Sequence, residues 1–185
     1  MRLIDHLRTC VRANRLANQR MHAAMASLSP AEFEAPRTSF FPSLSATLNH
    51  ILAVDAYYIA ALRGEADMEA QYRRFVPCAD VAELTERQRA SDERLIGHVD
   101  GLTEAGLEAR VVMDRGTHEQ VDGAAHVLAH LCMHQTHHRG QVHAMLAGTA
   151  VAPPQLDEFL MPSDAPLRAA DMRMLGWIEA DLFAR

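Results

Sequence analysis

The stretch that decides the fold runs from residue 125 to residue 146 and reads AHVLAHLCMHQTHHRGQVHAML. It holds six of the eleven histidines of the chain, and its apolar side chains recur every three or four residues. That period is typical of an amphipathic helix with one buried face. We expect this helix to begin near Gln120 and to end at Leu146, shortly before Gly148.

A helical wheel at about 100° per residue separates these histidines. With Leu131 at the centre of the apolar stripe, His138 falls about 20° and His134 about 60° away from it. Both side chains are therefore expected to point into the core. His130 lies at the edge of the stripe. Further round, towards solvent or the rim, lie His126, His137 and His143.

His134 and His138 form an i, i+4 pair, the spacing at which one helix can offer two imidazoles to one metal ion. A buried imidazole without a partner is costly, so two on one apolar face need a shared explanation. The alternative is a pair of core histidines that are satisfied by protein hydrogen bonds. We favour a metal site, and a catalytic site of this kind needs a third protein ligand from another helix.

The helix expected over residues 43–64 offers His50 as that third ligand. This helix is apolar around most of its circumference, which places it deep in the fold. His50 shares a face with Val54, Tyr57 and Ala61. Alone it would be interpreted as a core histidine, but the pair at His134 and His138 makes it the predicted third ligand. Weaker candidates, flanked by polar residues, are His6, His22 and His98.

Four long helices and one shorter helix account for most of the chain. Ser29-Pro30 ends the first, while Ser43 and Gly64 are the expected caps of the second. These lengths predict an all-α four-helix bundle with a short additional C-terminal helix, in a single domain over residues 1–185. The expected helices cover residues 3–28, 43–64, 81–99, 120–146 and 167–183.

The remaining segments carry weaker signals. Residues 109–119 could form one short hairpin, with a turn at Asp114-Arg115-Gly116. Residues 30–42 and 147–166 are expected to be irregular, and both contain prolines. We expect these two stretches to line an opening.

Composition excludes several classes of function. The net charge is −6, all 18 basic residues are arginine, and no lysine is present. There is thus no Schiff-base lysine and no P-loop, and the absence of a basic stripe argues against a nucleic-acid partner. No apolar run reaches the roughly 18 residues that span a bilayer. The three scattered cysteines favour a reducing cytoplasm without disulfides: Cys10, Cys78 and Cys132.

The segment His134-Gln-Thr-His-His138-Arg139-Gly140-Gln141 resembles the terminal motif of the DinB (damage-inducible)/YfiT-like superfamily. The upstream His50, in a Leu-Asn-His-Ile context, matches the first ligand of that family. The resemblance covers essentially the whole chain. It implies an up-down-down-up four-helix bundle, often homodimeric, with one divalent metal on His50, His134 and His138.

The resemblance also implies a function. Metals found in the family include nickel and zinc. Known relatives are S-transferases that use the low-molecular-weight thiols bacillithiol, mycothiol or glutathione, together with a maleylpyruvate isomerase and a hydrolase. We therefore expect a metal-dependent enzyme of the thiol S-transferase type that acts on a small molecule. The alternatives are a metal-dependent hydrolase and a non-enzymatic metal-binding stress-response protein.

Several neighbours of the predicted triad have open roles at this stage. Tyr57 and Tyr58 could donate hydrogen bonds near the metal or be core aromatics. Asp55 could orient a ligand or face a basic group. Arg139 is expected to be structural or at an interface, with an acidic substrate as the alternative, and Gln141 could hydrogen-bond to the site.

Overall fold

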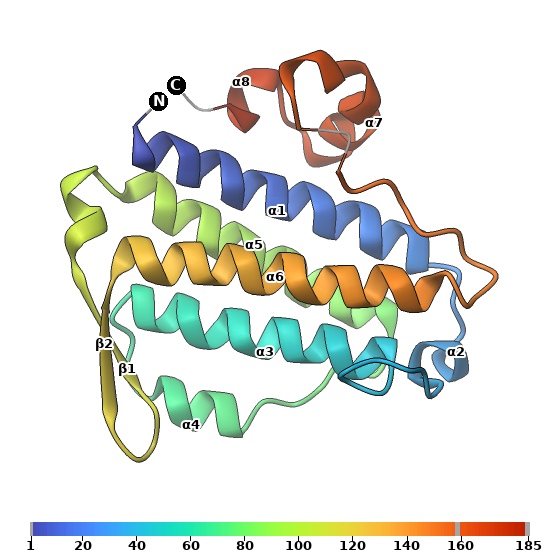
Figure 1. The fold of residues 1–185 in the computed structure, drawn as a ribbon, viewed down its shortest axis with the longest axis horizontal. Coiled ribbons are helices and arrows are strands. Elements are labelled where there is room, and N and C mark those ends of the chain that lie inside the picture. Colours follow the sequence, from blue (N-terminus) through green and yellow to red (C-terminus); the bar gives the residue numbers. More distant parts are fainter. Residues whose placement is uncertain (1, 158–159, 184–185) are drawn as a thin grey trace.

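Four long helices lie side by side in the computed structural model, which describes residues 2–157 and 160–183 (Figure 1). The first, α1, packs against both α5 and α6, and α3 also packs against both. Therefore α1 and α3 lie diagonally across the bundle, as do α5 and α6. The expected all-α four-helix bundle is confirmed. Its long helices are α1 (Leu3–Met25), α3 (Leu44–Leu62), α5 (Val81–Gly101) and α6 (Ala124–Leu146).

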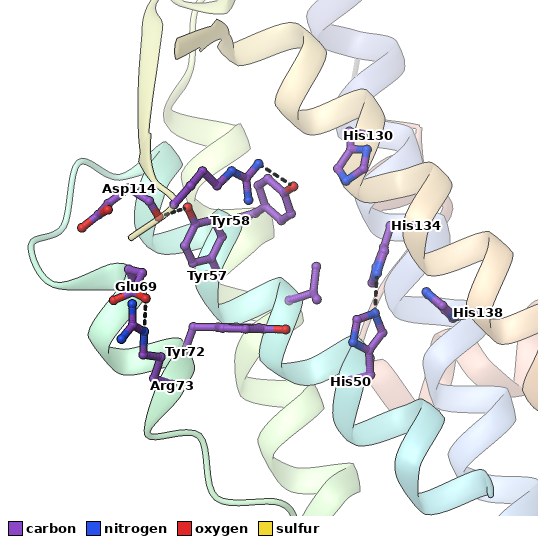
Figure 2. Close-up of a pocket in the computed structure, with 12 residues that line it drawn as sticks. His50, Tyr57, Tyr58, Glu69, Tyr72, Arg73, Asp114, His130, His134 and His138 are labelled. Carbon is purple, nitrogen blue, oxygen red and sulfur yellow. Dashed lines mark hydrogen bonds and ion pairs between the residues drawn. The ribbon is translucent and has the colours of Figure 1, made fainter. Parts of the chain in front are cut away.

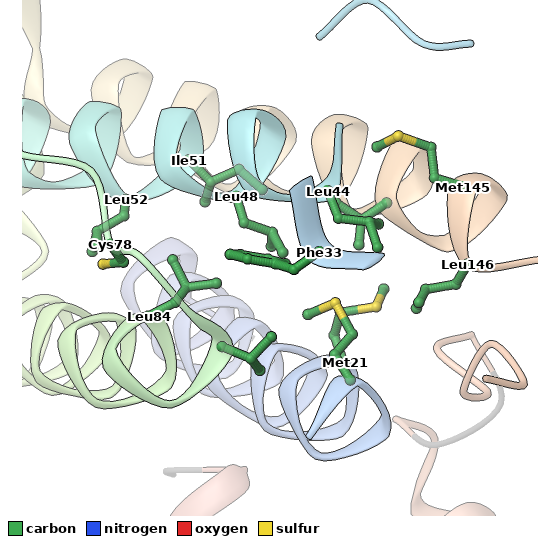
Figure 3. Close-up of a cluster of buried hydrophobic side chains, with 13 residues drawn as sticks. Met21, Phe33, Leu44, Leu48, Ile51, Leu52, Cys78, Leu84, Met145 and Leu146 are labelled. Carbon is green, nitrogen blue, oxygen red and sulfur yellow. The ribbon is translucent and has the colours of Figure 1, made fainter. Parts of the chain in front are cut away.

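Helices α1 and α6 run in one direction, and α3 and α5 run in the other (Figure 1). The contacts in the apolar core agree with these helix directions. At one end of the bundle, Met21 and Leu146 from the last turns of α1 and α6 pack with Leu44 and Leu84 from the first turns of α3 and α5 (Figure 3). The chain thus has the up-down-down-up order that the family resemblance implies.

Local signals set the ends of α3 as the sequence predicts. The Ser43 hydroxyl accepts a hydrogen bond from the backbone N–H of Ala46 at 3.0 Å. Beyond the other end, Gly64 adopts a φ of +65°, a conformation that glycine tolerates best.

The stretch from residue 30 to 42 is not wholly irregular as expected, because it begins with a short helix, α2 (Pro30–Glu34). Ser29 and Glu32 form a capping box at its start. Its Phe33 is fully buried in the apolar cluster that Figure 3 shows. Burial of this one large side chain explains why the short helix forms.

The hairpin is confirmed, but its second strand lies later than predicted. Strand β1 (Arg110–Asp114) pairs antiparallel with β2 (Glu119–Gly123). Because residues 119–123 pair with β1, α6 begins at Ala124 and not near Gln120. The pattern missed this strand because β2 has no alternation of buried and exposed residues.

Three short helices complete the fold. Helix α4 (Met68–Arg73) was not predicted. The helix expected over residues 167–183 is two helices, α7 (Ala165–Leu175) and α8 (Glu179–Leu182), which Gly176 separates with a φ of +68°. Single turns of 3-10 helix cover Ala105–Glu108 (η1) and Pro162–Asp164 (η2).

Candidate metal centre

Three histidines from two neighbouring helices, α3 and α6, point toward one another (Figure 2). His50 comes from α3, and His134 and His138 come from successive turns of α6. The Nε2 atoms of His50 and His134 are 3.1 Å apart. One nitrogen from each of the three rings lies within 4.8 Å of the others. The structure therefore brings together the three residues that the sequence predicts.

The donor set fits a divalent metal ion. Metal–imidazole bonds are about 2.0–2.1 Å long, so one ion can contact two nitrogens that are 3.1 Å apart. Neutral imidazoles suit zinc and nickel among other transition metals. The Nδ1 atom of His134 is buried with no hydrogen-bond partner in the described part of the chain. The protein thus leaves this ring without a full set of its own contacts.

The protonation of the three rings also suits ligation. Burial is the main cause that lowers the pKa of His50 to about 4 and of His134 to about 3, and neighbouring imidazoles add to it. Burial also lowers the pKa of His138. The rings are therefore neutral at pH 7, the form that offers a lone pair to a metal.

Gln141 orients one of the three rings. Its Oε1 atom is 2.9 Å from Nδ1 of His138 and accepts a hydrogen bond from it. This contact assigns the ring proton to Nδ1 and leaves the lone pair on Nε2. The predicted hydrogen bond from Gln141 to the site is confirmed.

Phe41 is a part of the site that sequence reasoning missed. It lies in the loop between α2 and α3, and its ring centre is 4.4 Å from that of His50 and 5.6 Å from that of His138. It therefore covers one side of the cluster with apolar surface. The only signal was its place in a proline-bearing stretch that was expected to line an opening.

A pocket of about 550 Å³ extends from the cluster towards the hairpin (Figure 2). Tyr57 and Tyr58 line it, but their hydroxyls serve the hairpin and not the histidines. The Tyr57 hydroxyl donates to the carbonyl of Asp114 at 2.5 Å, and the Tyr58 hydroxyl accepts from Arg115 at 3.1 Å. The interpretation as core aromatics is therefore confirmed, since Tyr57 is buried in an apolar cluster against which Tyr58 packs, and both rings also form a wall of the pocket. The other lining residues are Val54, Glu69, Tyr72, Arg73 and His130, with the three histidines.

The remaining histidines lie outside the cluster. His130 is exposed at the pocket rim, with its ring centre 6.1 Å from that of His134. His143 is half-buried and contacts the Pro154 carbonyl at 3.0 Å. His22 is buried in the core, away from the histidine cluster, and burial lowers its pKa to about 3. Exposed or half-buried are His6, His98, His126 and His137.

The described part of the second proline-bearing stretch does not line the pocket at the histidine cluster. Part of it, Pro153–Asp157, lines a separate groove with residues of α1 and α6, among them Cys10 and Cys132. The expectation that it lines an opening therefore holds for this groove and not for the candidate metal centre.

Arg139 and Asp55 belong to a buried network of polar side chains between α1, α3, α5 and α6. Arg139 donates to the side-chain oxygens of Asn14, Asn18 and Gln135. Gln135 and Gln88 donate to Asp55, and Asn18 and Gln88 donate to Asp92. Arg139 is therefore structural, and Asp55 contacts amides and no histidine. The buried network is Asn14, Asn18, Asp55, Gln88, Asp92, Gln135 and Arg139.

Burial also changes the ionisation of this network. It raises the pKa of the Asp55 carboxyl well above its usual range, and that of Asp92 to about 6. The Arg139 guanidinium opposes both shifts.

Fold and site together define a class of helical-bundle proteins with a three-histidine candidate metal centre. The model of the DinB family matches residues 4–170, and the chain belongs to that family. No curated protein matches the chain. Within the described residues, no helix has both the length and the apolar character needed to cross a membrane.

Proposed function

We propose that this protein is a divalent-metal-dependent enzyme of the thiol S-transferase type, with His50, His134 and His138 as the ligands of nickel or zinc. The observation that carries the proposal is the convergence of three neutral imidazoles, with the Nε2 atoms of His50 and His134 facing each other at 3.1 Å. Membership of the DinB family supports it.

Three protein ligands leave a coordination position open, as in catalytic and not structural sites. A divalent ion held in this way supplies Lewis-acid chemistry that lowers the pKa of a bound thiol or water. The residues of the chain prepare the surroundings. Phe41 excludes water from one side of the cluster, and Val54 and Tyr57 give the pocket an apolar wall for an organic electrophile. His130 remains at the rim, where it is exposed.

The carboxylates near the pocket favour thiol transfer over hydrolysis. Hydrolysis at such a site is helped by a carboxylate base within hydrogen-bond reach of the attacking water. Among the described residues that line the pocket, Glu69 is paired with Arg73, and Asp114 accepts from the Gly116 backbone. Asp55 is held in the buried network. A thiol needs no such base once its pKa is lowered.

The test is thiol consumption in the presence of an electrophile such as monochlorobimane, with glutathione, bacillithiol and mycothiol supplied in turn. We expect consumption with at least one thiol, and its loss on chelation and in His138→Ala. The matched control is His137→Ala, which removes the adjacent, exposed imidazole and should retain activity. Consumption that persists after complete chelation would contradict the proposal.

The homodimer also stays a prediction, and it rests on the family resemblance. Met133 is exposed on α6, on a different face from the histidine pair, and could contribute to such an interface. Sedimentation at high micromolar concentration is expected to show a dimer, and a monomer alone would contradict it.

A further inference from the structure

Arg115 lies at the end of the pocket that is remote from the histidines. It follows β1 directly, in the turn of the hairpin, and lines the same pocket as the histidine cluster. Its partner Tyr58 comes eight residues after His50 on α3. At 1.5 Å per residue, that is about 12 Å along the helix axis. The pocket therefore joins a guanidinium at one end to three imidazoles at the other.

Aromatic and amide contacts hold the Arg115 guanidinium in place. Its central carbon lies 5.2 Å from the ring centre of Tyr57 and 5.4 Å from that of Tyr58. Its Nη2 donates to the Tyr58 hydroxyl at 3.1 Å, and its Nε donates to Gln120 at 3.0 Å. These contacts orient the planar fork and leave its charge uncompensated.

No carboxylate of the described chain forms an ion pair with Arg115. The nearby acids are engaged elsewhere: Glu69 with Arg73, Asp114 with the backbone N–H of Gly116, and Asp122 with the Gln120 amide. A half-buried guanidinium without a counter-ion, in a pocket with aromatic walls, is suited to bind an anionic group of a ligand.

The backbone that carries Arg115 is also fixed. Its N–H donates to the His118 carbonyl at 2.9 Å, and the Tyr57 hydroxyl holds the preceding carbonyl of Asp114. Gly116 has a φ of +77°, and a Cβ at this position would lie 2.7 Å from Nη2 of Arg73 on α4. The turn therefore packs closely against α4, so the guanidinium is positioned before a ligand arrives.

We propose that Arg115 binds a carboxylate of the small molecule whose reacting end lies at the histidine cluster. This inference rests on the proposed function, which places the reacting end of the small molecule at the histidine cluster. It makes the ligand an extended molecule, with its acid group at the hairpin and its reacting group at His50, His134 and His138. The carboxylate can belong either to the thiol or to the electrophile, and the two sources give different outcomes below.

Calorimetric titration of the metal-depleted protein tests the proposal with two matched pairs of probes. The thiol pair is glutathione and its diethyl ester, in which both carboxylates are blocked. The thiol-free pair is 6-phenylhexanoate and 6-phenylhexanamide. In the parent, we expect the more acidic member of at least one pair to bind about 10-fold more tightly, as a charge-assisted hydrogen bond provides. Discrimination in the glutathione pair alone assigns the carboxylate to the thiol, and in the phenylhexanoate pair alone to the electrophile.

Three variants make the result specific to Arg115. Arg115→Gln and Arg115→Met, two neutral replacements with different packing, should abolish the preference for the acid. Arg115→Lys should retain part of it. The matched control is Arg110→Gln, which removes the same charge from the exposed start of β1, outside this pocket. Circular dichroism shows which variants are folded.

Three results would overturn the inference. The first is equal affinity of the parent for both members of each pair, and the second is loss of the preference in Arg110→Gln as well as in Arg115→Gln. Full retention in a folded neutral variant at position 115 also overturns it. Metal binding by the parent is measured in parallel. If metal binds and the acid preference is absent, only this inference fails. If the preference is present and no metal binds, only the proposed function fails.

Discussion

Two polar clusters lie on different sides of α6. Two consecutive residues of this helix, His138 and Arg139, belong to different clusters. His138 turns towards α3 and joins the histidine cluster of His50, His134 and His138. Arg139, the next residue, turns towards α1 and joins the buried network. A step of about 100° around the helix is enough to separate these two roles.

The two clusters differ in how their polar groups pair, although each holds one buried polar atom without a partner in the described chain: Oδ1 of Asp55 and Nδ1 of His134. In the buried network, the Arg139 donors meet amide oxygens, and the Gln88 and Asn18 amides meet carboxylates. In the histidine cluster, two Nε2 atoms face each other, and Nδ1 of His134 has no partner in the described chain. In the buried network most donors meet acceptors, which makes it structural. In the histidine cluster imidazole nitrogens face each other, so an external partner is needed to bridge them.

The largest expected effect is on the buried network. Arg139→Met leaves the buried side-chain oxygens of Asn14, Asn18 and Gln135 without their donor. Because each unsatisfied buried acceptor costs about 1–3 kcal/mol, the free energy of unfolding should fall by about 3 kcal/mol or more. Urea denaturation of the metal-depleted protein at pH 8 measures this. Arg74→Met, at an exposed arginine at the end of α4, is the control and should have little effect. A loss below about 1 kcal/mol for Arg139→Met would contradict the structural role of Arg139.

The second-largest effect on the free energy of unfolding should appear only when a metal ion binds to the histidine cluster. Zinc or nickel at 100 times its dissociation constant should raise the free energy of unfolding of the parent by about 2.7 kcal/mol. His134→Ala should lose this gain, because it removes a ligand, while its metal-free stability remains near that of the parent. Equal stabilisation of parent and variant would mean that the metal binds elsewhere.

A smaller effect is expected at the residue that orients a ligand. Gln141→Ala removes the hydrogen bond to Nδ1 of His138, so it should weaken metal affinity about 10- to 100-fold without abolishing binding. Competition with a chromophoric chelator measures it. His137→Ala, which removes only the other partner of Gln141, is the control and should bind as the parent does. If the metal affinity of Gln141→Ala equals that of the parent, the proposed role of Gln141 in orienting His138 is wrong.

The smallest effect concerns His22, which is buried but lies in neither cluster. Its pKa is lowered to about 3 by burial and by the Arg15 and Arg139 charges, so the folded state binds its proton less readily than the unfolded chain. Its contribution is complete above about pH 6.5 and falls as the pH drops towards 3, by at most about 1.4 kcal/mol per unit.

His22→Gln should therefore lose about 1 kcal/mol less stability than the parent on acidification, when both are followed by urea denaturation between pH 7 and pH 5.5. Both proteins are metal-depleted, so protonation of the histidine cluster is common to them. His118→Gln, at the exposed hairpin turn, should follow the parent. Parallel stability curves for the parent and His22→Gln would contradict the buried, neutral state of His22.

The sequence predicts the parts of this structure that depend on periodicity and strong local signals. The four long helices follow from their apolar repeats, and the start of α3 follows from Ser43. The wheel places His134 and His138 on the inward face, and the bundle argument adds His50. Each of these features depends on residues close together in the chain or on a single helical face.

The rest depends on contacts between distant residues. Helix α4 is six residues long and contains no buried residue, so no apolar pattern marks it. Arg115 acquires its role only when the hairpin meets Tyr57 and Tyr58, 57 residues away in the case of Tyr58. Phe41 covers the histidines from a loop without a helical period. His22 looks polar in sequence, yet the packing of the bundle buries it.

Metal stoichiometry tests the central claim most directly. The parent and the variants His50→Ala, His134→Ala and His138→Ala are purified, loaded with excess zinc or nickel, dialysed and analysed by elemental spectrometry. We predict one equivalent in the parent and in the His130→Ala control, and a loss of bound metal in each of the three variants. A full equivalent in all three would contradict the account, and a loss in His130→Ala as large as in His134→Ala would replace the open catalytic site with a closed structural one.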